Sequence, residues 1–234
     1  MKSIKKILPV LIALLTASII FASCASEASK KASKTKALEK VVVLDDKGAA
    51  FGITTPEWVT AYIMNGNSAV QKMSAYNDKY CFVVENNNAS RDFAIAAVQN
   101  ASGPRAIADK ISTTVSSSVS TKVDALSAAP GAKAEMEQRI KTATEQLTNA
   151  SFNGAAKEAD WWQTVENKTS KNVETRAYAL WLIDKKSLDT QVAAQLQRLQ
   201  DQNKAMSEAE KSIYADLIKQ IRGTGGFGSI QTED

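Results

Sequence analysis

The first twenty-three of the 234 residues most constrain what this chain can fold into, because they have the pattern of a secretory signal peptide. Three lysines precede an almost wholly apolar run over residues 7–21, and small residues follow it. A cationic start, a short apolar core and a small-residue exit are typical of such a leader. The run is shorter than the roughly 18–20 residues that a membrane-spanning helix needs. We therefore expect residues 1–23 to be a signal peptide that takes no part in the mature fold.

A cysteine follows the leader directly. Ala22-Ser23-Cys24 resembles the lipobox of bacterial lipoproteins, in which the cysteine receives a diacylglyceryl group and becomes the first residue of the mature chain. Phe21 occupies the position where the usual lipobox has Leu, Val or Ile, and this looser form is similar to the lipoboxes of spirochaete lipoproteins. The resemblance implies an exported protein anchored to a bacterial membrane, expected to be the outer membrane, by acyl chains such as palmitate on Cys24. The alternatives are ordinary cleavage near Ala22 and an uncleaved anchor.

Residues 24–40 are expected to be the lipidated cysteine and a flexible tether. Leu38 is the one large apolar residue between residues 25 and 40. Such a stretch cannot bury enough surface to offset the entropy of ordering it. Its lysines either contact anionic headgroups or are simply solvated.

Composition excludes several classes of function. The net charge of +4 includes three leader lysines, so the mature chain is near +1 (4 minus 3) and gives no reason to expect nucleic-acid binding. The chain has no histidine, which excludes Ser-His-Asp and Cys-His hydrolases and histidine-built zinc sites. If Cys24 is acylated, Cys81 is the only thiol left and no intramolecular disulfide is possible. Cys81 lies in an apolar run, and we expect it to be a buried core residue rather than a reactive thiol.

The first half of the body alternates strand and helix signals, namely β-branched runs, turn residues and helix-starting residues. The elements expected there are, in chain order, a strand at Val41–Leu44, a turn at Asp45–Gly48, a helix from a Thr55 cap and Pro56 to Asn65–Asn67, a short helix at Ser68–Tyr76, and a strand at Lys79–Glu85 closed by Asn86–Asn88.

A long helical signal follows, with Ser90 as its cap. Gly103-Pro104 interrupts it, because a proline inside a helix removes a hydrogen bond and clashes with the preceding turn. We expect a restart there, with Ser102 as the cap and Pro104 in the first turn. After the restart, apolar residues recur every four positions, at Ile107, Ile111, Val115 and Val119. The same stretch is rich in serine and threonine, which are poor helix formers, so its helix must depend on packing.

The second half predicts a further helix, a hairpin and two terminal helices. Two strands joined by a polar turn at Asn167–Asn172 form an antiparallel hairpin, and Glu174–Ile183 is apolar on both faces, as in a central strand. The expected elements are a helix at Lys133–Ala150, strands at Glu158–Lys168 and Glu174–Ile183, and helices over residues 188–222 that begin near Ser187, break near Ala205 and restart at a capping box of Ser207 and Glu210. Residues 41–222 are thus expected to form a single α+β domain, and the glycine-rich residues 223–234 a disordered tail.

Four groups of residues are candidates for function, and each also has a structural explanation. The tryptophans at 58, 161, 162 and 181 either line a ligand cleft or belong to the core, and the core is favoured. The C-terminal glycines at 223, 225, 226 and 228 suggest a phosphate-binding loop. A dinucleotide fingerprint, however, needs a strand before it and a helix after it, whereas here a helix is expected before the glycines and none after them. Asp45, Asp46 and Asp92 suit turn or cap roles as well as chemistry. The seam of Leu196, Leu199, Met206, Ile213 and Leu217, with Asn203 and Glu210 on it, either packs inside the protein or pairs with another chain.

Four stretches, in an order that starts from Pro56–Val59, carry a resemblance to a known family: residues 92–97, 105–111 and 116–119 of the long helical region, and Tyr178–Asp184 of the last strand. They resemble a bacterial lipoprotein family that is named for a twenty-kilodalton surface lipoprotein and includes a flagellar basal-disk lipoprotein. The resemblance covers roughly residues 55–188 and implies a small α+β fold, a curved antiparallel sheet packed against long helices. Gly103-Pro104 departs from the family's continuous helix. The implied roles are assembly within the envelope, sometimes at the flagellar motor, with no catalysis.

The sequence therefore predicts a lipid-anchored envelope protein that binds other envelope proteins or itself, with no cofactor, metal or catalytic residues. The alternative is a periplasmic or surface lipoprotein that binds a small ligand. An enzyme that uses carboxylates alone is the least favoured class, because it needs two perturbed carboxyl groups in one pocket.

Overall fold

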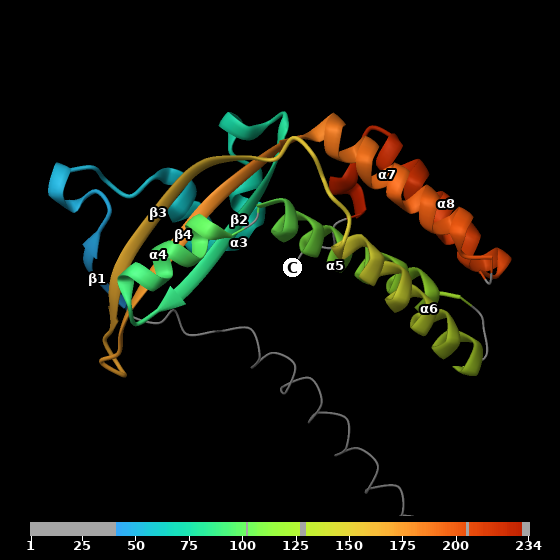
Figure 1. Ribbon diagram of the computed structural model, residues 1–234, viewed down its shortest axis with the longest axis horizontal. Coiled ribbons are helices and arrows are strands. Elements are labelled where there is room, and N and C mark those ends of the chain that lie inside the picture. Colours follow the sequence, from blue (N-terminus) through green and yellow to red (C-terminus); the bar gives the residue numbers. More distant parts are fainter. Residues whose placement is uncertain (1–40, 102, 127–129, 205, 231–234) are drawn as a thin grey trace, which may run out of the picture. The chain divides into compact units, whose positions relative to one another are not determined.

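The structure is a computed structural model that describes residues 41–101, 103–126, 130–204 and 206–230. The chain divides into two compact units, one made of Val42–Glu166 with Asn172–Asp234, and the other of Met1–Val41 with Asn167–Lys171. All helices labelled in Figure 1 lie in the first unit. In the second unit, the side-chain oxygen of Asn167 accepts hydrogen bonds from the backbone N–H groups of Thr169 and Ser170.

The first unit is built on a four-stranded antiparallel sheet, which with its helices confirms the predicted α+β class. Its strands are β1 (Val41–Asp46), β2 (Lys79–Asn88), β3 (Ala156–Asn167) and β4 (Val173–Asp184), in the order β1-β3-β4-β2. The β3–β4 hairpin and the central place of β4 are therefore as predicted. The expected end of the second strand at Asn86–Asn88 is wrong, because these asparagines pair with Ala177, Arg176 and Thr175 of β4.

The sheet has a different cover on each face (Figure 1). Tyr178 and Leu180 of β4 pack with residues of α3 (Glu57–Gln71) on one face. Ala177 and Ala179 pack on the other face against α4 (Arg91–Asn100). The alternation along β4 therefore divides its side chains between two cores, which explains why both of its faces are apolar.

Helix α3 begins differently from the prediction but is interrupted where the sequence predicts. Pro56, with ψ of 145°, is the N-cap and no side chain caps the helix, so the expected roles of Thr55 as cap and of Pro56 as first helical residue are wrong. The predicted break at Asn65–Asn67 is confirmed, because Asn65 and Gly66 have non-helical backbone angles and divide α3 at a kink, where the φ of 70° at Gly66 favours glycine. Beyond the kink, Asn67 and Gln71 are one turn apart and use their amide groups to hydrogen-bond the backbone of Lys79, Cys81 and Val83. They occupy part of the outer edge of β2, where a neighbouring strand would otherwise bind.

The interruption at Gly103 is confirmed. The Ser90 hydroxyl accepts a hydrogen bond from the N–H of Phe93 at the start of α4, and α5 (Gly103–Asp124) restarts after α4. The predicted cap Ser102 lies outside the described residues. Gly103 lies against the indole ring of Trp181, so closely that an added Cβ would be 2.1 Å from the nearest ring atom. Glycine is therefore required at position 103, because the Cβ of any other residue would collide with this ring.

We expect Gly103→Ala to lower the free energy of unfolding by about 1–3 kcal/mol, because the new methyl group has to displace a large ring. Gly131→Ala is the matched control, since nothing lies within 4 Å of its added Cβ, and it should raise stability by up to about 1 kcal/mol through helix propensity. Urea unfolding of both variants measures the difference. Equal effects at the two glycines would contradict the close approach.

Four helices enclose the larger core: α5, α6 (Pro130–Thr148), α7 (Lys185–Gln202) and α8 (Glu208–Arg222). The predicted spacing on α5 is confirmed, because its residues at 107, 111, 115 and 119 are all buried. The buried Ser112 hydroxyl donates to the Thr144 carbonyl at 2.7 Å and so joins α5 to α6. The apolar seam of α7 and α8 is also buried in this core. Of the two alternatives, it therefore packs inside the protein and does not pair with another chain.

Both terminal helices have side-chain caps. Asp184 accepts a hydrogen bond from the N–H of Ser187 at 2.8 Å, so α7 begins at Lys185, two residues before the predicted start. The capping box of Ser207 and Glu210 at the start of α8 is present as predicted. Within the described ranges no helix is long and apolar enough to cross a membrane.

The prediction of a disordered tail is wrong for residues 223–230. The segment turns back after α8 and forms a short 3-10 helix, Phe227–Ile230, in which Phe227 and Ile230 are buried. Phe227 contacts the ring of Tyr80 edge-on, with the ring centroids 5.9 Å apart. Two apolar side chains thus anchor a glycine-rich stretch to the core. Residues 231–234 lie outside the described residues.

Candidate functional site

The predicted lipidation site and its surroundings cannot be placed. Cys24, the signal peptide at residues 1–23 and the tether at residues 24–40 all lie outside the described residues.

The four tryptophans do not meet in one cleft. Trp58 and Trp161 are buried together on the α3 face of the sheet. Trp162 and Trp181 pack on the opposite face with the small residues of α4 and β4. Because Trp161 and Trp162 are neighbours on one strand, they point to opposite faces. The prediction that the tryptophans belong to the core is confirmed, and the alternative of a ligand cleft lined by all four is wrong.

Cys81 is also a core residue. Its side chain is buried beside Trp58 and Leu180, and burial raises the pKa of its thiol to about 12. A nucleophilic cysteine needs the thiolate, which is favoured by nearby cations or helix N-termini and disfavoured by apolar burial. We therefore expect the thiol of Cys81 to stay protonated near neutral pH.

We expect the thiol of Cys81 to react with a disulfide reagent at about pH 8 roughly a thousandfold more slowly in the native protein than after unfolding, because so little thiolate is present. The measurement uses a Cys24→Ser variant, in which Cys81 is the only cysteine, with and without denaturant. Native and unfolded rates within about tenfold of each other would show that the side chain is accessible.

The candidate carboxylates have structural roles. Asp46 accepts a hydrogen bond from the N–H of Gly48 at 2.8 Å and so shapes the turn after β1. Asp45 and Asp92 both lie within 4 Å of the guanidinium of Arg91, at 3.6 and 3.7 Å. Across the described parts of the chain, no group of three acidic, cysteine or histidine side chains could hold a metal ion.

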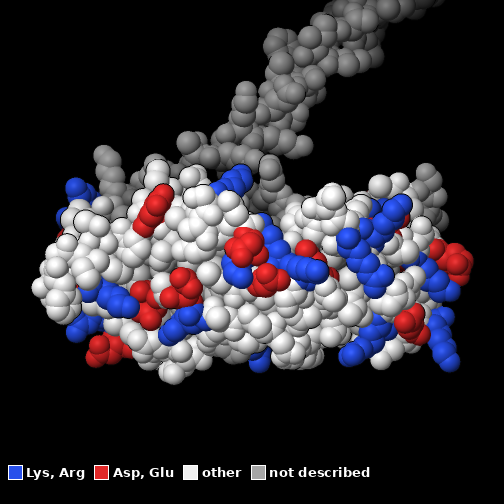
Figure 2. All heavy atoms as spheres, turned by 90° about the horizontal axis from the view of Figure 1, so that it is seen from above, with Lys and Arg blue, Asp and Glu red and all other residues white. Residues whose placement is uncertain are grey.

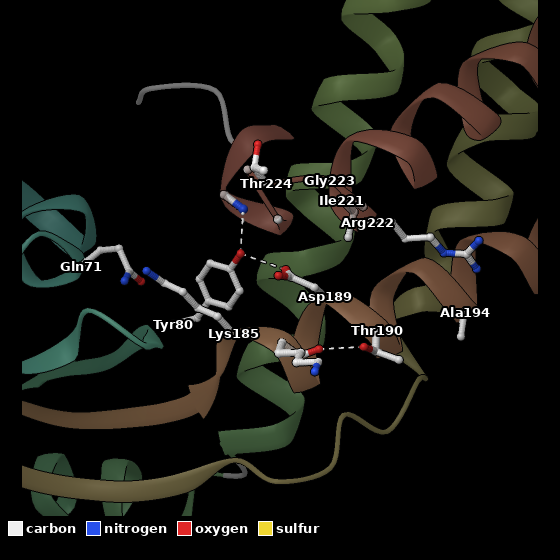
Figure 3. Close-up of a pocket in the computed structure, with 14 residues that line it drawn as sticks. Gln71, Tyr80, Lys185, Asp189, Thr190, Ala194, Ile221, Arg222, Gly223 and Thr224 are labelled. Atoms are coloured by element: carbon white, nitrogen blue, oxygen red, sulfur yellow. Dashed lines mark hydrogen bonds between the residues drawn. The ribbon is translucent and has the colours of Figure 1, made fainter.

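The structure instead forms a cavity of about 760 Å³ between α7, the end of α8 and the turn after it (Figure 3). We call it the α7–tail cavity. Small-molecule sites are typically about 300–1,000 Å³ in volume. Its lining comes from four separate segments: Gln71, Tyr80, residues 185, 186, 189, 190 and 194 of α7, and residues 221–226 and 228 of the C-terminal segment.

Asp189 holds the cavity wall in place. Its Oδ1 accepts hydrogen bonds from the Tyr80 hydroxyl at 2.9 Å and from the N–H of Phe227 at 2.6 Å. The same Tyr80 oxygen accepts a hydrogen bond from the N–H of Gly228 at 3.0 Å, as Figure 3 shows. Burial and the neighbouring carboxylate raise the pKa of Tyr80, so its hydroxyl stays protonated. Asp189 is the only carboxylate among the described residues of this lining, and it is thus committed to internal hydrogen bonds.

The other charged side chains of the described lining are basic. Lys185, Lys186 and Arg222 line the cavity, and Lys185 lies 5.7 Å from the centre of the Tyr80 ring while donating to the Asn77 carbonyl. A second cavity of about 520 Å³ shares Arg222 and Gly223 with the first and adds Lys219. On the face of the protein that Figure 2 shows, Lys and Arg side chains lie among Asp and Glu side chains.

A different surface lies at the other end of the sheet. Strand β1 is an edge strand, and a short 3-10 helix, η1 (Ala49–Phe51), follows it. Four large apolar side chains on this segment are between 47 and 80 % exposed: Val43, Leu44, Phe51 and Ile53. We call them the β1–η1 surface. In the described part of the chain, no side chain hydrogen-bonds the backbone of residues 42–44, in contrast to the covered edge of β2.

Sequence reasoning had noted the glycines of the tail but not the cavity. The available signal was the pair of large apolar residues at 227 and 230 inside a glycine-rich run, since such residues anchor a segment when a core lies within reach. Comparisons of the chain with protein-family models, with curated proteins and with solved structures gave no match.

Proposed function

We propose that this chain is a lipid-anchored envelope protein that acts by binding other envelope proteins or further copies of itself, without catalysis. Cys24 carries the lipid, and residues 24–40 connect it to the α+β fold at a bacterial membrane, the outer membrane in this proposal. The leader and lipobox residues support the anchor. The stretches on α4, α5 and β4 that resemble the lipoprotein family support an assembly role.

The observation that carries the binding function is the β1–η1 surface. Soluble proteins usually protect a sheet edge with charges, prolines or a covering helix, since an apolar edge readily pairs with another chain. Here Phe51 is 80 % exposed and Ile53 58 % exposed, next to an edge strand of three valines and a leucine. Exposed apolar groups beside a free strand edge are typical of protein-binding surfaces.

The anchor makes a modest interface sufficient. Each buried methylene of an acyl chain adds about 0.8 kcal/mol of membrane affinity, so several chains make release negligible. The protein then meets partners at a raised effective concentration within the plane of the membrane. We therefore expect complexes that depend on both the lipid and the β1–η1 surface.

The test is chemical cross-linking in intact cells followed by detergent-phase extraction. Wild type should enter the detergent phase and give discrete cross-linked species, and Cys24→Ala should lose both. Phe51→Ser with Ile53→Ser should keep the detergent partition but lose the cross-linked species. The matched control is Met64→Ser with Phe93→Ser, which removes two equally exposed apolar side chains from α3 and α4.

Each part of the proposal has its own contrary result. Wild type that stays in the aqueous phase contradicts the lipid anchor. Wild type that partitions but forms no cross-linked species contradicts assembly. If the control variant loses the species as completely as the Phe51 and Ile53 variant, the binding surface does not lie at β1–η1.

The α7–tail cavity favours a second candidate function, a lipoprotein that binds a small ligand. Its volume is in the range of small-molecule sites, and its lining offers both charged and neutral polar groups. This function does not exclude the first, because the cavity and the β1–η1 surface are formed by different elements.

A further inference from the structure

The α7–tail cavity and the cavity beside it are lined by four basic side chains and one carboxylate. Lys185, Lys186 and Arg222 belong to the first cavity, and Lys219 joins Arg222 in the second. The carboxylate is Asp189, which already accepts two hydrogen bonds from the protein. The lining therefore carries an excess of positive charge over both cavities.

These cations lack counterions in the described part of the chain, although the Lys185 ammonium donates a hydrogen bond to the Asn77 carbonyl at 2.7 Å. Among the residues that the structure describes, no carboxylate lies within ion-pair distance of any of the four. Elsewhere on the surface, lysines do find such partners, as Lys211 does with Glu208 at 2.7 Å. Lysines and an arginine that gather around a hollow without counterions repel one another, and a bound anion relieves that repulsion.

The lining also supplies hydrogen-bond donors suited to an anion's oxygens. Arg222, at the end of α8, has a planar guanidinium that can donate two parallel hydrogen bonds to one oxyanion. Thr224 lines the same cavity from the turn after α8 and adds a neutral hydroxyl to the lining. Positive charge and a guanidinium that can donate two hydrogen bonds are features by which proteins bind phosphate groups.

From these features we infer that the α7–tail cavity binds a small molecule that carries a phosphate group, held by Lys186 and Arg222. A phosphate group offers more acceptor oxygens than a single carboxylate does, and so matches several cations better. The inference makes the second candidate function specific and needs neither the lipid anchor nor the β1–η1 surface. The phosphate belongs either to a soluble phosphomonoester or to the headgroup of an anionic phospholipid, which present the same chemistry.

The probe for a soluble ligand is glycerol phosphate, titrated into the full chain in a non-ionic detergent and followed by thermal unfolding and calorimetry. A ligand that binds only the folded state raises the unfolding temperature in a saturable way. The probe for a headgroup is a phosphatidylcholine vesicle with and without phosphatidylglycerol, used with Cys24→Ala so that the lipid anchor does not contribute.

Two charge-matched double variants identify the site. Lys186→Gln with Arg222→Gln should weaken binding by about tenfold or more, because two charged hydrogen-bond donors are lost. Lys72→Gln with Arg198→Gln removes the same charges from exposed positions that line neither cavity, and should change affinity by less than about twofold. All four side chains are exposed, so unfolding without ligand should be unchanged in both variants.

Saturable binding of glycerol phosphate that depends on Lys186 and Arg222 supports the site with a soluble ligand. Vesicle binding that needs phosphatidylglycerol and the same two residues supports it with a lipid headgroup. The inference is overturned if neither probe binds, or if the control variant weakens binding as much as the cavity variant. A negative result here leaves the cross-linking test of the proposed function untouched, since that test reads out a different surface.

Discussion

Phe227→Ala is expected to lower the free energy of unfolding by about 3–5 kcal/mol, the usual range for removing a fully buried phenylalanine side chain. Phe227 has no exposed surface although it lies in a run of four glycines between residues 223 and 228. Its ring contacts Tyr80 edge-on, and its N–H donates to Asp189. The substitution therefore removes the main apolar contact that holds the C-terminal segment to the larger core.

The matched control is Phe51→Ala, the same substitution at a side chain that is 80 % exposed. Surface changes of this kind usually alter stability by less than about 0.5 kcal/mol. Urea unfolding of wild type and the two variants gives the comparison directly. If Phe227→Ala is no more harmful than Phe51→Ala, the tail does not pack as the structure shows, and the wall of the α7–tail cavity is lost with it.

The elements that sequence predicted well are those whose burial is periodic along the chain. Ile107, Ile111 and Val115 recur every four residues, so one face of α5 was identifiable without knowing what covers it. The two-residue alternation of β4 predicted a central strand for the same reason. The split of Trp161 and Trp162 between two faces of the sheet follows from the same alternation, so a shared cleft for these two side chains was already disfavoured.

Features that depend on contacts between distant segments were not predictable in this way. The tail has a composition typical of disorder, and only the surface offered by Tyr80 and α7 offsets its ordering entropy. The cavity likewise needs Gln71, Tyr80, α7 and the C-terminal turn, which no local pattern brings together. Asn86–Asn88 were misassigned because asparagine disfavours strands in general, whereas here the long β4 supplies backbone partners.

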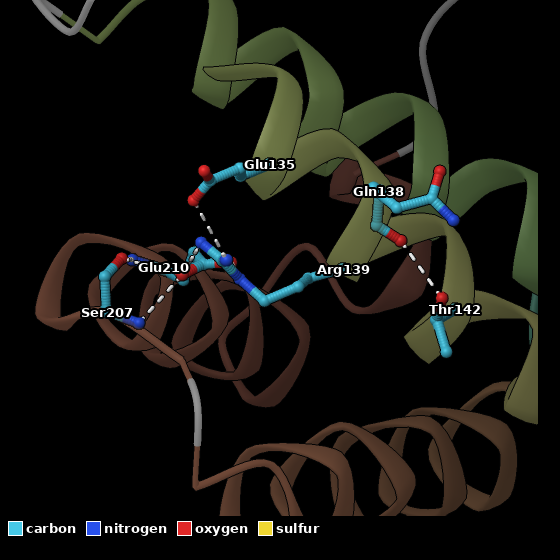
Figure 4. A network of polar contacts seen from close by, with 6 residues as sticks. All are labelled: Glu135, Gln138, Arg139, Thr142, Ser207 and Glu210. Carbon is cyan, nitrogen blue, oxygen red and sulfur yellow. Dashed lines mark hydrogen bonds and ion pairs between the residues drawn. The ribbon is translucent and has the colours of Figure 1, made fainter. Parts of the chain in front are cut away.

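The second large effect is expected at the ion pair between α6 and α8 (Figure 4). Glu210 is 2 % exposed and receives two hydrogen bonds from the guanidinium of Arg139, at 2.8 and 3.1 Å. It also accepts hydrogen bonds from the backbone N–H and from the hydroxyl of Ser207, each at 2.7 Å. Burial by itself would raise the pKa of Glu210, but the hydrogen bonds from Arg139 and Ser207 outweigh it and hold the pKa below 4.5.

Arg139→Met is expected to lower the free energy of unfolding by about 3 kcal/mol near neutral pH, because it leaves a buried carboxylate without its cation. Arg139→Met with Glu210→Gln removes both charges and keeps an oxygen for the capping box, so it should restore most of the loss. Glu135→Gln is the control, since Glu135 is the exposed partner of Arg139 at 3.8 Å and should contribute less than about 1 kcal/mol.

The pH dependence separates this pair from a simple packing defect. In wild type the pKa of Glu210 is lowered by folding, so its contribution to stability is present above about pH 4.5 and is lost as the pH falls through the lowered pKa. Without the arginine, burial raises the pKa of Glu210, and protonation then favours the folded state. The stability difference between wild type and Arg139→Met should therefore shrink between about pH 7 and about pH 4. A difference that stays constant over this range would mean that Arg139 contributes through its apolar stem and not through its charge.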